Sequence, residues 1–193
     1  MTKRIILAIT GASGALYALE FLELMTELEV EVHGVISNAG RQVLKIELGL
    51  TTAQLPLCRW FGLDEFTAPM ASGSSLYQGM AVLPCTMGTL GAIANGNTSN
   101  LIHRAADVSL KERRPLVLAV RETPLNQIHL ENMLRADRAG AIVCPAMPAF
   151  YHRPRTIEEI ARDFATRVAC LLGIEVPTLK RWDGSAAEAA EVG

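Results

Sequence analysis

The sequence predicts an α/β fold in which a mainly parallel sheet lies between two layers of helices. Two observations predict this three-layer sandwich. Continuous apolar runs, such as residues 4–10 and 79–84, are typical of parallel strands that are covered on both faces. Segments with helical apolar spacing follow these runs, and about five strand–helix pairs in series favour right-handed crossovers between parallel strands.

The first strand and the first helix are the clearest pair. Residues 4–10 are rich in β-branched side chains, and residues 11–14 turn the chain into a helix predicted over about 15–28. The apolar residues of that helix recur at helical spacing, at Leu16, Leu19, Leu22 and Met25.

The later elements follow the same alternation. The other strands are predicted at residues 30–37, 79–84, 116–120 and 141–143. The other helices are predicted at residues 38–49, 89–95, 99–112, 123–138 and 156–172. Gly49 is typical of a helix end, Pro124 of a helix start and Thr156 of an N-cap. Residues 50–78 show no regular pattern.

The size and charge of the chain bound its organisation. We expect one domain over residues 1–182, because 193 residues suit a single core. We expect a flexible tail over residues 183–193, because residues 186–193 are of low complexity. A formal net charge of −2 gives no general attraction to nucleic acid or anionic lipid. The mean hydropathy of +0.24 is high for a small monomer and predicts a homo-oligomer.

The cysteines and the apolar stretches indicate a reducing compartment and no membrane span. Cys58, Cys85, Cys144 and Cys170 form no C-x-x-C pair, so buried free thiols are expected rather than zinc or disulfides. The basic and apolar start resembles a signal peptide, but residues 11–14 interrupt it. A long stretch without Asp, Glu, Lys or Arg, residues 66–102, is punctuated by glycine and proline. We therefore expect a cytoplasmic protein.

Small and hydroxyl residues follow three of the predicted strands. Residues 11–14 lie between a strand and a helix N-terminus, where backbone N–H groups favour an anion such as phosphate. A tight turn that needs small residues is the alternative, since no complete nucleotide fingerprint is present. Ser37 and the segment Thr86–Thr89 repeat this chemistry after two further strands. Three such loops at one sheet edge predict a mononucleotide site.

A group of cations is the second candidate feature. Its members are Lys111, Arg121, Arg153 and Arg167, with Tyr151 and His152 nearby in sequence. The charged run 111–114 is open to a second interpretation, a solvated face. Arg121 and Glu122 follow a strand at its carboxyl end, where arginine can hold a phosphate and glutamate can act as an acid. No Asp-rich segment and no Ser-His-Asp or Cys-His pattern is present, which disfavours a hydrolase and a magnesium-held diphosphate.

Six motifs together resemble the UbiX family of bacterial flavin prenyltransferases, over about residues 3–182. The motifs are Gly11-Ala12-Ser13-Gly14-Ala15, Pro84-Cys85-Thr86-Met87-Gly88-Thr89, Arg104-Ala105-Ala106-Asp107-Val108, Leu110-Lys111-Glu112-Arg113-Arg114-Pro115-Leu116, Arg121-Glu122-Thr123-Pro124-Leu125 and Pro145-Ala146-Met147-Pro148-Ala149-Phe150-Tyr151. Thr86 stands where many relatives carry serine, and Cys144 where proline is common. Segment 50–70 has no motif that matches.

The resemblance implies a Rossmann-like flavoprotein fold and transfer of a dimethylallyl group from dimethylallyl monophosphate to reduced FMN, without a metal. The prenylated FMN would serve a UbiD-type decarboxylase, and the family implies a cytoplasmic homododecamer. By similarity, FMN would be held by Gly11, Ala12, Ser13, Ser37, Thr86, Met87, Gly88, Thr89 and Arg121. The prenyl phosphate would be held by Lys111, Tyr151 and Arg167, with Trp182 close to the site.

The resemblance also implies catalytic roles for Ser13, Glu47 and Glu122. Glu122 would donate a proton to the departing phosphate, and Ser13 would relay a proton from the flavin ring. Preorganised Lys, Arg and Tyr donors would stabilise the charge that grows on the phosphate. A related flavin-dependent cysteine decarboxylase is one alternative, but residues 146–151 read A-M-P-A-F-Y and depart from its P-x-M-N-x-x-M-W segment. A regulatory flavin-binding subunit without its own chemistry is the other.

Overall fold

The computed structural model describes residues 3–56, 58–177 and 179, and these form the predicted α/β sandwich. The strands are β1 (Arg4–Ile9), β2 (Glu31–Ile36), β3 (Arg59–Phe61), β4 (Gly79–Cys85), β5 (Leu116–Val120) and β6 (Ile142–Val143). The helices are α1 (Ala15–Glu27), α2 (Asn38–Leu48), α3 (Met87–Ala94), α4 (Leu101–Lys111), α5 (Gln127–Arg138) and α6 (Ile157–Leu171), with 3₁₀ turns η1 (Thr52–Gln54) and η2 (Pro69–Ala71). The predicted tail 183–193 and Trp182 lie outside these residues.

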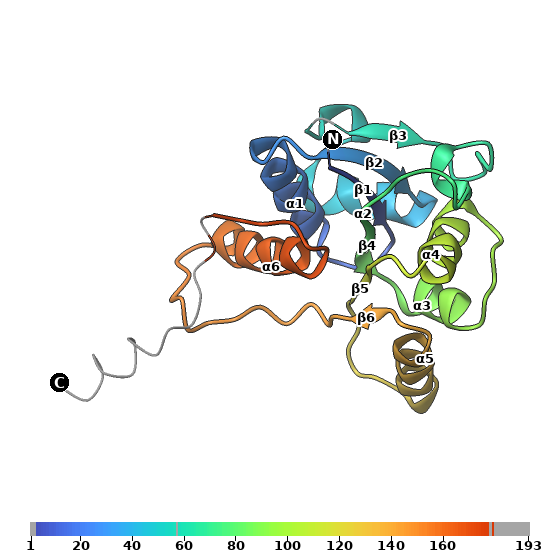
Figure 1. Cartoon of the computed structure of the whole chain (residues 1–193). Helices are drawn as coiled ribbons and strands as arrows, with labels where there is room; N and C mark the ends of the chain where they lie inside the picture. The colour runs from blue at the N-terminus through green and yellow to red at the C-terminus, as the bar shows by residue number, and fades with distance from the viewer. Residues whose placement is uncertain (1–2, 57, 178, 180–193) are drawn as a thin grey trace.

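The strands form one parallel sheet in the order β3-β2-β1-β4-β5-β6 (Figure 1). The chain moves outward from β1 to β3 and then returns to pair β4 on the other side of β1. In parallel α/β sheets, ligands bind beyond the carboxyl ends of the strands where the order reverses. The expected ligand site is therefore beside the carboxyl ends of β1 and β4.

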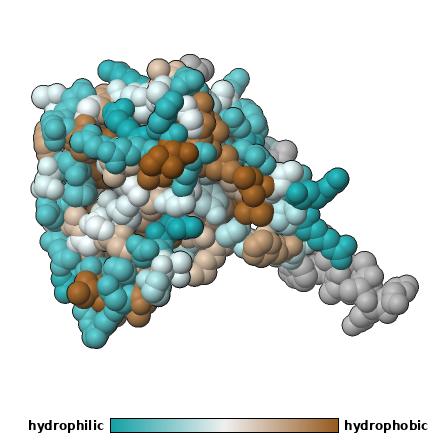
Figure 2. Space-filling model, turned by 180° about the vertical axis from the view of Figure 1, so that it is seen from behind, coloured by the Kyte–Doolittle hydropathy of each residue, from teal (hydrophilic) through white to brown (hydrophobic). Residues whose placement is uncertain are grey.

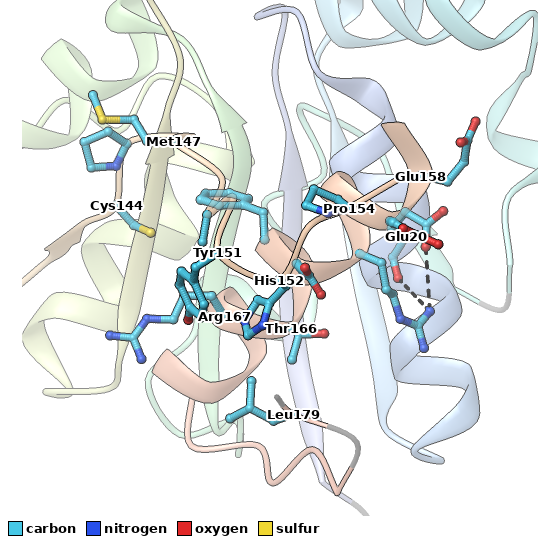
Figure 3. Close-up of a pocket in the computed structure, with 16 residues that line it drawn as sticks. Glu20, Cys144, Met147, Tyr151, His152, Pro154, Glu158, Thr166, Arg167 and Leu179 are labelled. Carbon is cyan, nitrogen blue, oxygen red and sulfur yellow. Dashed lines mark hydrogen bonds and ion pairs between the residues drawn. The ribbon is translucent and has the colours of Figure 1, made fainter. Parts of the chain in front are cut away.

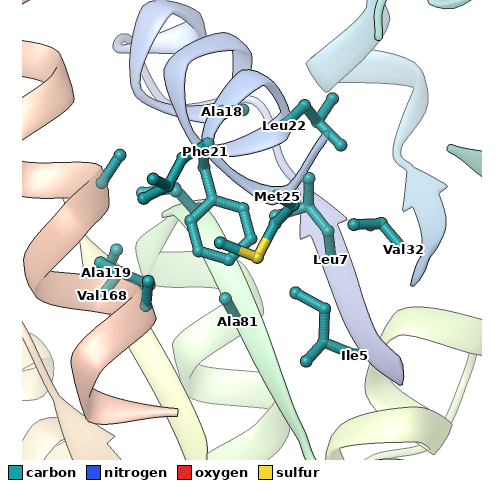
Figure 4. Close-up of a cluster of buried hydrophobic side chains, with 14 of the residues drawn as sticks. Ile5, Leu7, Ala18, Phe21, Leu22, Met25, Val32, Ala81, Ala119 and Val168 are labelled. Carbon is teal, nitrogen blue, oxygen red and sulfur yellow. The ribbon is translucent and has the colours of Figure 1, made fainter. Parts of the chain in front are cut away.

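Alternation along the strands divides the core into two layers. Ile5 and Leu7 of β1 pack in the cluster that α1, α2 and α6 cover, whereas Ile6 and Ala8 face the α3 and α4 side. In Figure 1, α1 and α6 lie on one side of the sheet and α3 and α4 on the other. Figure 4 shows Phe21 of α1 at the centre of the first cluster. Burial of both strand faces explains why these strands read as continuous apolar runs.

Three sequence predictions need correction. The short edge strand β3, inside segment 50–78, was not predicted, because three residues are too few to show an alternating pattern. The helix predicted from residue 123 begins at Gln127, since the Asn126 side chain accepts a hydrogen bond from His129 N at 2.9 Å and caps the helix there. The helix predicted from residue 89 begins at Met87.

No helix in the described part of the chain combines the length and the apolar character needed to span a bilayer.

A partly buried chain of polar contacts joins β1, β2 and the loop before β4, with His33 and Tyr77 buried and Arg4 and Glu31 partly exposed. The ring atom Nε2 of His33 lies 2.9 Å from Glu31 Oε1, and Glu31 Oε2 lies 2.8 Å from Arg4 Nε. The carboxylate can only accept, so Nε2 of the neutral ring donates and Nδ1 accepts from the Tyr77 hydroxyl at 2.6 Å. Burial lowers the pKa of His33, although Glu31 partly offsets this.

This network predicts acid sensitivity of the fold. Because the pKa of His33 is lower in the folded state than its ordinary value of 6.5, the unfolded chain binds more protons below that pH. The contribution of neutral His33 to stability is therefore full above pH 6.5 and is lost as the pH falls below it. Urea unfolding between pH 7.5 and 5.5 should show this loss in the wild type and a smaller loss in His33→Gln. Equal pH dependence in both proteins would contradict the assignment to His33.

Candidate active site

Backbone hydrogen bonds gather the loops at the carboxyl edge of the sheet. Ser37 N donates to Ile9 O at 2.9 Å and so ties the end of β2 to the end of β1. Arg121 N donates to Cys85 O at 3.1 Å and ties the end of β5 to the end of β4. The predicted loops that follow β1, β2, β4 and β5 therefore share one edge.

Two helix N-termini open onto this edge. Ser37 caps α2 and accepts from Gly40 N at 3.0 Å, while Thr86 caps α3 and accepts from Thr89 N at 3.1 Å. The Thr86 hydroxyl donates to Thr89 Oγ1 at 3.0 Å. An added Cβ at Gly88 would meet no atom within 4 Å, so the first turn of α3 faces open space. These N–H groups and hydroxyls can bind an anion such as a phosphate.

The glycines of the first loop have a structural cause. A Cβ at Gly11 would clash with Ala39 Cβ, because the loop packs against the start of α2. Gly14 has a φ of 114°, which favours glycine. The tight-turn interpretation therefore accounts for both glycines, while Ala12 is buried between them and Ser13 is exposed at the turn.

A carboxylate of the protein itself fills the N-terminus of α1. Glu47 Oε2 accepts from Gly14 N at 3.0 Å and from Ala15 N at 2.8 Å. Partial burial raises the pKa of Glu47, but hydrogen bonds from the Ser13 side chain and these N–H groups outweigh it and lower the pKa overall. A ligand anion such as phosphate was predicted at this helix, but in this structure the group that accepts from its N–H groups is Glu47. The starts of α2 and α3 are the other helix N-termini at this edge.

Arg121 and Glu122 follow β5 at the predicted edge. Burial raises the pKa of Tyr17 and the charge of Arg121 partly offsets this, while the same charge helps to lower the pKa of Glu47. Arg121 is therefore close to Tyr17 and Glu47. Glu122 is exposed, and its Oε1 accepts from Thr123 N at 3.0 Å.

A cavity of about 720 Å³ lies between α6, α1 and the extended segment that follows β6. Tyr151 of the extended segment and Arg167 of α6 both line it and lie close together in Figure 3. Cys144, Met147 and Phe164 supply apolar wall. Burial raises the pKa of the Cys144 thiol, and Arg167 partly offsets this. The structure thus brings Tyr151 and Arg167 to the same cavity.

The two arginines of α6 that line the cavity differ in their partners. Arg162 contacts Glu20, with 3.8 Å between Nη1 and Oε2, and also pairs with Glu27. Within the described residues, no carboxylate lies in ion-pair distance of Arg167. Arg167 can therefore hold an anionic ligand, whereas the charge of Arg162 is already neutralised.

Within one chain, Lys111 does not lie in the cavity that Tyr151 and Arg167 line. It ends α4, which carries the chain from the carboxyl edge back to the amino end of β5, and its Nζ pairs with Glu112. It lines a second cavity, of about 650 Å³, together with Pro115 and Ile142 at the amino ends of β5 and β6. The predicted grouping of Lys111 with Tyr151 and Arg167 is therefore not met by a single copy.

Sequence reasoning missed Thr10, which bridges two loops of the site. Its hydroxyl donates to Pro84 O at 2.7 Å and accepts from Thr86 N at 2.9 Å. A hydroxyl residue directly between a buried strand and the 11–14 turn was the available signal. No group of three or more His, Cys, Asp or Glu side chains in the described part of the chain could hold a metal ion.

Comparison with known proteins agrees with this architecture. The model of the family described as Flavoprotein matches residues 1–163. The flavin prenyltransferase UbiX of Methanothermobacter thermautotrophicus is 47% identical over 184 residues, which cover 94% of this chain and 96% of that protein. The solved structure of AnUbiX in complex with FMN and dimethylallyl pyrophosphate has a TM-score of 0.91 at 40% identity, covering 95% of this chain and 99% of that one.

Two further solved structures differ in what they show: one is a relative within the family, and the other shares only the fold. A dodecameric FMN-dependent UbiX-like decarboxylase from Escherichia coli O157:H7 has a TM-score of 0.88 at 39% identity, covering 94% of this chain and 100% of that one. A PPC decarboxylase has a TM-score of 0.61 at 20% identity, covering 77% of this chain and 84% of that one, which shows a shared fold alone. The family model matches most of the chain, and curated relatives are 44–47% identical over nearly its full length. This chain therefore belongs to the flavoprotein family and, within it, to the UbiX flavin prenyltransferases.

Proposed function

We propose that this enzyme joins the dimethylallyl group of dimethylallyl monophosphate to reduced FMN and releases phosphate. The observation that carries the proposal is the cavity in which Tyr151 and Arg167 meet an apolar wall, next to the carboxyl edge of the sheet. The relatives named flavin prenyltransferases and the AnUbiX complex with FMN and a prenyl donor support it. Reduced FMN would supply the nucleophilic ring atoms of the reaction.

The carboxyl edge fits FMN. The starts of α2 and α3 offer N–H groups, and the Ser37 hydroxyl accepts from Gly40 N, so its own proton can be donated to a phosphate oxygen. The open space over Gly88 leaves room for the ligand, and Arg121 adds a positive charge nearby. We assign FMN binding to Gly11, Ala12, Ser13, Ser37, Thr86, Met87, Gly88, Thr89 and Arg121.

The cavity fits the prenyl donor. Tyr151 and Arg167 would donate to the donor phosphate, whose charge grows as the allylic bond breaks. Met147 and Phe164 would keep water from the allylic group. Arginine can stabilise the phosphate without a metal, so we expect product in the presence of a chelator. We assign to Glu122 the proton given to the phosphate, and to Trp182, outside the described residues, a place beside the donor.

We further propose a homo-oligomer, a dodecamer, in which Lys111 reaches the donor site of a neighbouring copy. Ile128, Leu130 and Leu134 of α5 are at least half exposed, at 66%, 54% and 50%. Figure 2 shows brown residues on the lobe at its lower left, which α5 forms. The dodecameric Escherichia coli relative supports burial of such a surface between copies. Light scattering of the purified protein tests the assembly.

Shared sites predict complementation between variants. Lys111→Ala and Arg167→Ala should each lose at least about 90% of the wild-type rate, because each removes one cation from every donor site. Co-expression of the two variants should restore part of the activity, since some sites then combine Lys111 of one copy with Arg167 of another. A mixture that stays as inactive as the single variants would contradict supply of Lys111 by a neighbour.

The product and its recipient are also proposals. Prenylated FMN is a modified cofactor, so we propose that a UbiD-type decarboxylase receives it and that both proteins work in the cytoplasm. Parallel assays with dimethylallyl monophosphate and dimethylallyl pyrophosphate identify the donor, because AnUbiX was solved with the pyrophosphate.

The test of the function is anaerobic incubation with reduced FMN, dimethylallyl monophosphate and EDTA, followed by mass analysis of the released flavin. A gain of one C5H8 unit supports prenyl transfer. The Escherichia coli relative is described as a decarboxylase, which makes decarboxylation the second candidate. Unmodified flavin together with carbon dioxide release from an aromatic acid would favour that activity and overturn the proposal.

A further inference from the structure

Thr10 joins β1 and β4 at the place where the strand order reverses. The residue is 2% exposed and follows β1 directly. Its hydroxyl donates to Pro84 O at 2.7 Å and accepts from Thr86 N at 2.9 Å, and its backbone N–H donates to Pro84 O at 3.3 Å. One buried side chain therefore fixes two backbone groups around the end of β4.

The bond to Thr86 N matters because Thr86 is the N-cap of α3. The cap residue stands outside the helical hydrogen bonds, so its N–H needs an acceptor elsewhere. Thr10 supplies that acceptor. The Thr86 hydroxyl in turn accepts from Thr89 N and donates to Thr89 Oγ1, so the orientation of Thr86 sets the first turn of α3. A shift at Thr86 would move the N–H groups that face the open space over Gly88.

We propose that Thr10 is a positioning residue for the phosphate of the flavin, acting through Thr86 and the start of α3. The inference rests on the proposed function only in taking FMN as the ligand at this edge. Thr10 holds the Pro84–Thr86 backbone before the ligand arrives, so binding does not have to order the loop. Loss of its hydroxyl leaves Thr86 N–H and Pro84 O each short of one hydrogen bond.

The test compares FMN with riboflavin, which has the same ring and no phosphate. Thr10→Val keeps the shape of the side chain and removes the hydroxyl, whereas Thr10→Ser keeps the hydroxyl. We expect Thr10→Val to weaken the Kd for FMN by about 10- to 100-fold, to change the Kd for riboflavin by less than about threefold and to leave the donor KM unchanged. Thr10→Ser should restore FMN affinity to within about threefold of the wild type. Ser109→Ala, which removes another buried hydroxyl, is the matched control and should change neither Kd.

Equal weakening of both flavins by Thr10→Val, or no rescue by Thr10→Ser, would overturn the positioning role. If Thr10→Val fails to fold, Thr10→Cys, with its weak donor and acceptor, should lose part of the preference for FMN over riboflavin, and an unchanged preference overturns the proposal. Failure of the proposed function gives a different result, because unmodified flavin after incubation with the prenyl donor would refute prenyl transfer and leave the effect of Thr10 on the Kd for FMN unchanged.

Discussion

Replacing Arg167 with alanine is expected to lower kcat for prenyl transfer by about 100- to 1000-fold. Arg167 faces the cavity, and in the described part of the chain it has no carboxylate in ion-pair distance, so its donors are available to the phosphate (Figure 3). The phosphate gains charge as the allylic bond breaks, so we expect the arginine to stabilise the transition state more than the bound donor. The loss should therefore fall mainly on kcat rather than on the donor KM, measured under saturating reduced FMN.

Arg162→Ala is the matched control for Arg167→Ala. Both arginines are on α6 and line the same cavity, but Arg162 is paired with Glu20 and Glu27. Removal of the Arg162 side chain should change kcat and the donor KM by less than about threefold, because a partly exposed ion pair contributes little free energy. Arg167→Lys should fall between alanine and the wild type, because lysine keeps the charge and loses the planar fork. Equal losses in Arg162→Ala and Arg167→Ala would contradict a specific role for Arg167.

Replacing Glu47 with glutamine is expected to lower kcat by at least about 100-fold while both substrates still bind. The Ser13 side chain helps to lower the pKa of Glu47, which puts its hydroxyl near the carboxylate. In a proton relay, the Ser13 oxygen would accept a proton from a ligand at the carboxyl edge and pass its own proton to Glu47. Glutamine keeps the size and one acceptor oxygen for the N–H groups of Gly14 and Ala15, but it cannot take up the proton. Single-turnover rates under anaerobic conditions measure the effect.

Ser13→Ala and the pH dependence check the same relay. A relay in which Ser13 and Glu47 act in series predicts that the double variant is no slower than the slower single variant. The pKa of Glu47 lies below its ordinary value of 4.5, so the acceptor stays ionised and the wild-type rate should not fall between pH 7 and about 5 through this group. A Glu47→Gln rate within about twofold of the wild type would contradict the relay.

Local sequence features predicted most of the elements and many of the candidate site residues. Apolar runs on both faces identify β1 and β4, and the hydroxyls that follow strands are at the carboxyl edge, where Ser37 and Thr86 cap helices. These features are readable because period, caps and turns depend on residues only a few positions apart. The motifs further indicated the family, which the comparisons confirm.

The tertiary structure decided what depends on distant residues. The strand order places β4 beside β1, and this alone brings Thr10 to Thr86 across 76 positions. The fold also fills the N-terminus of α1 with Glu47 and puts Lys111 at the opposite edge from Arg121. No local pattern encodes these relations, because strand neighbours and the direction in which a helix returns the chain are set by packing of the whole sheet. The sequence thus determined the chemistry available to this protein, and the packing decided which of those groups meet.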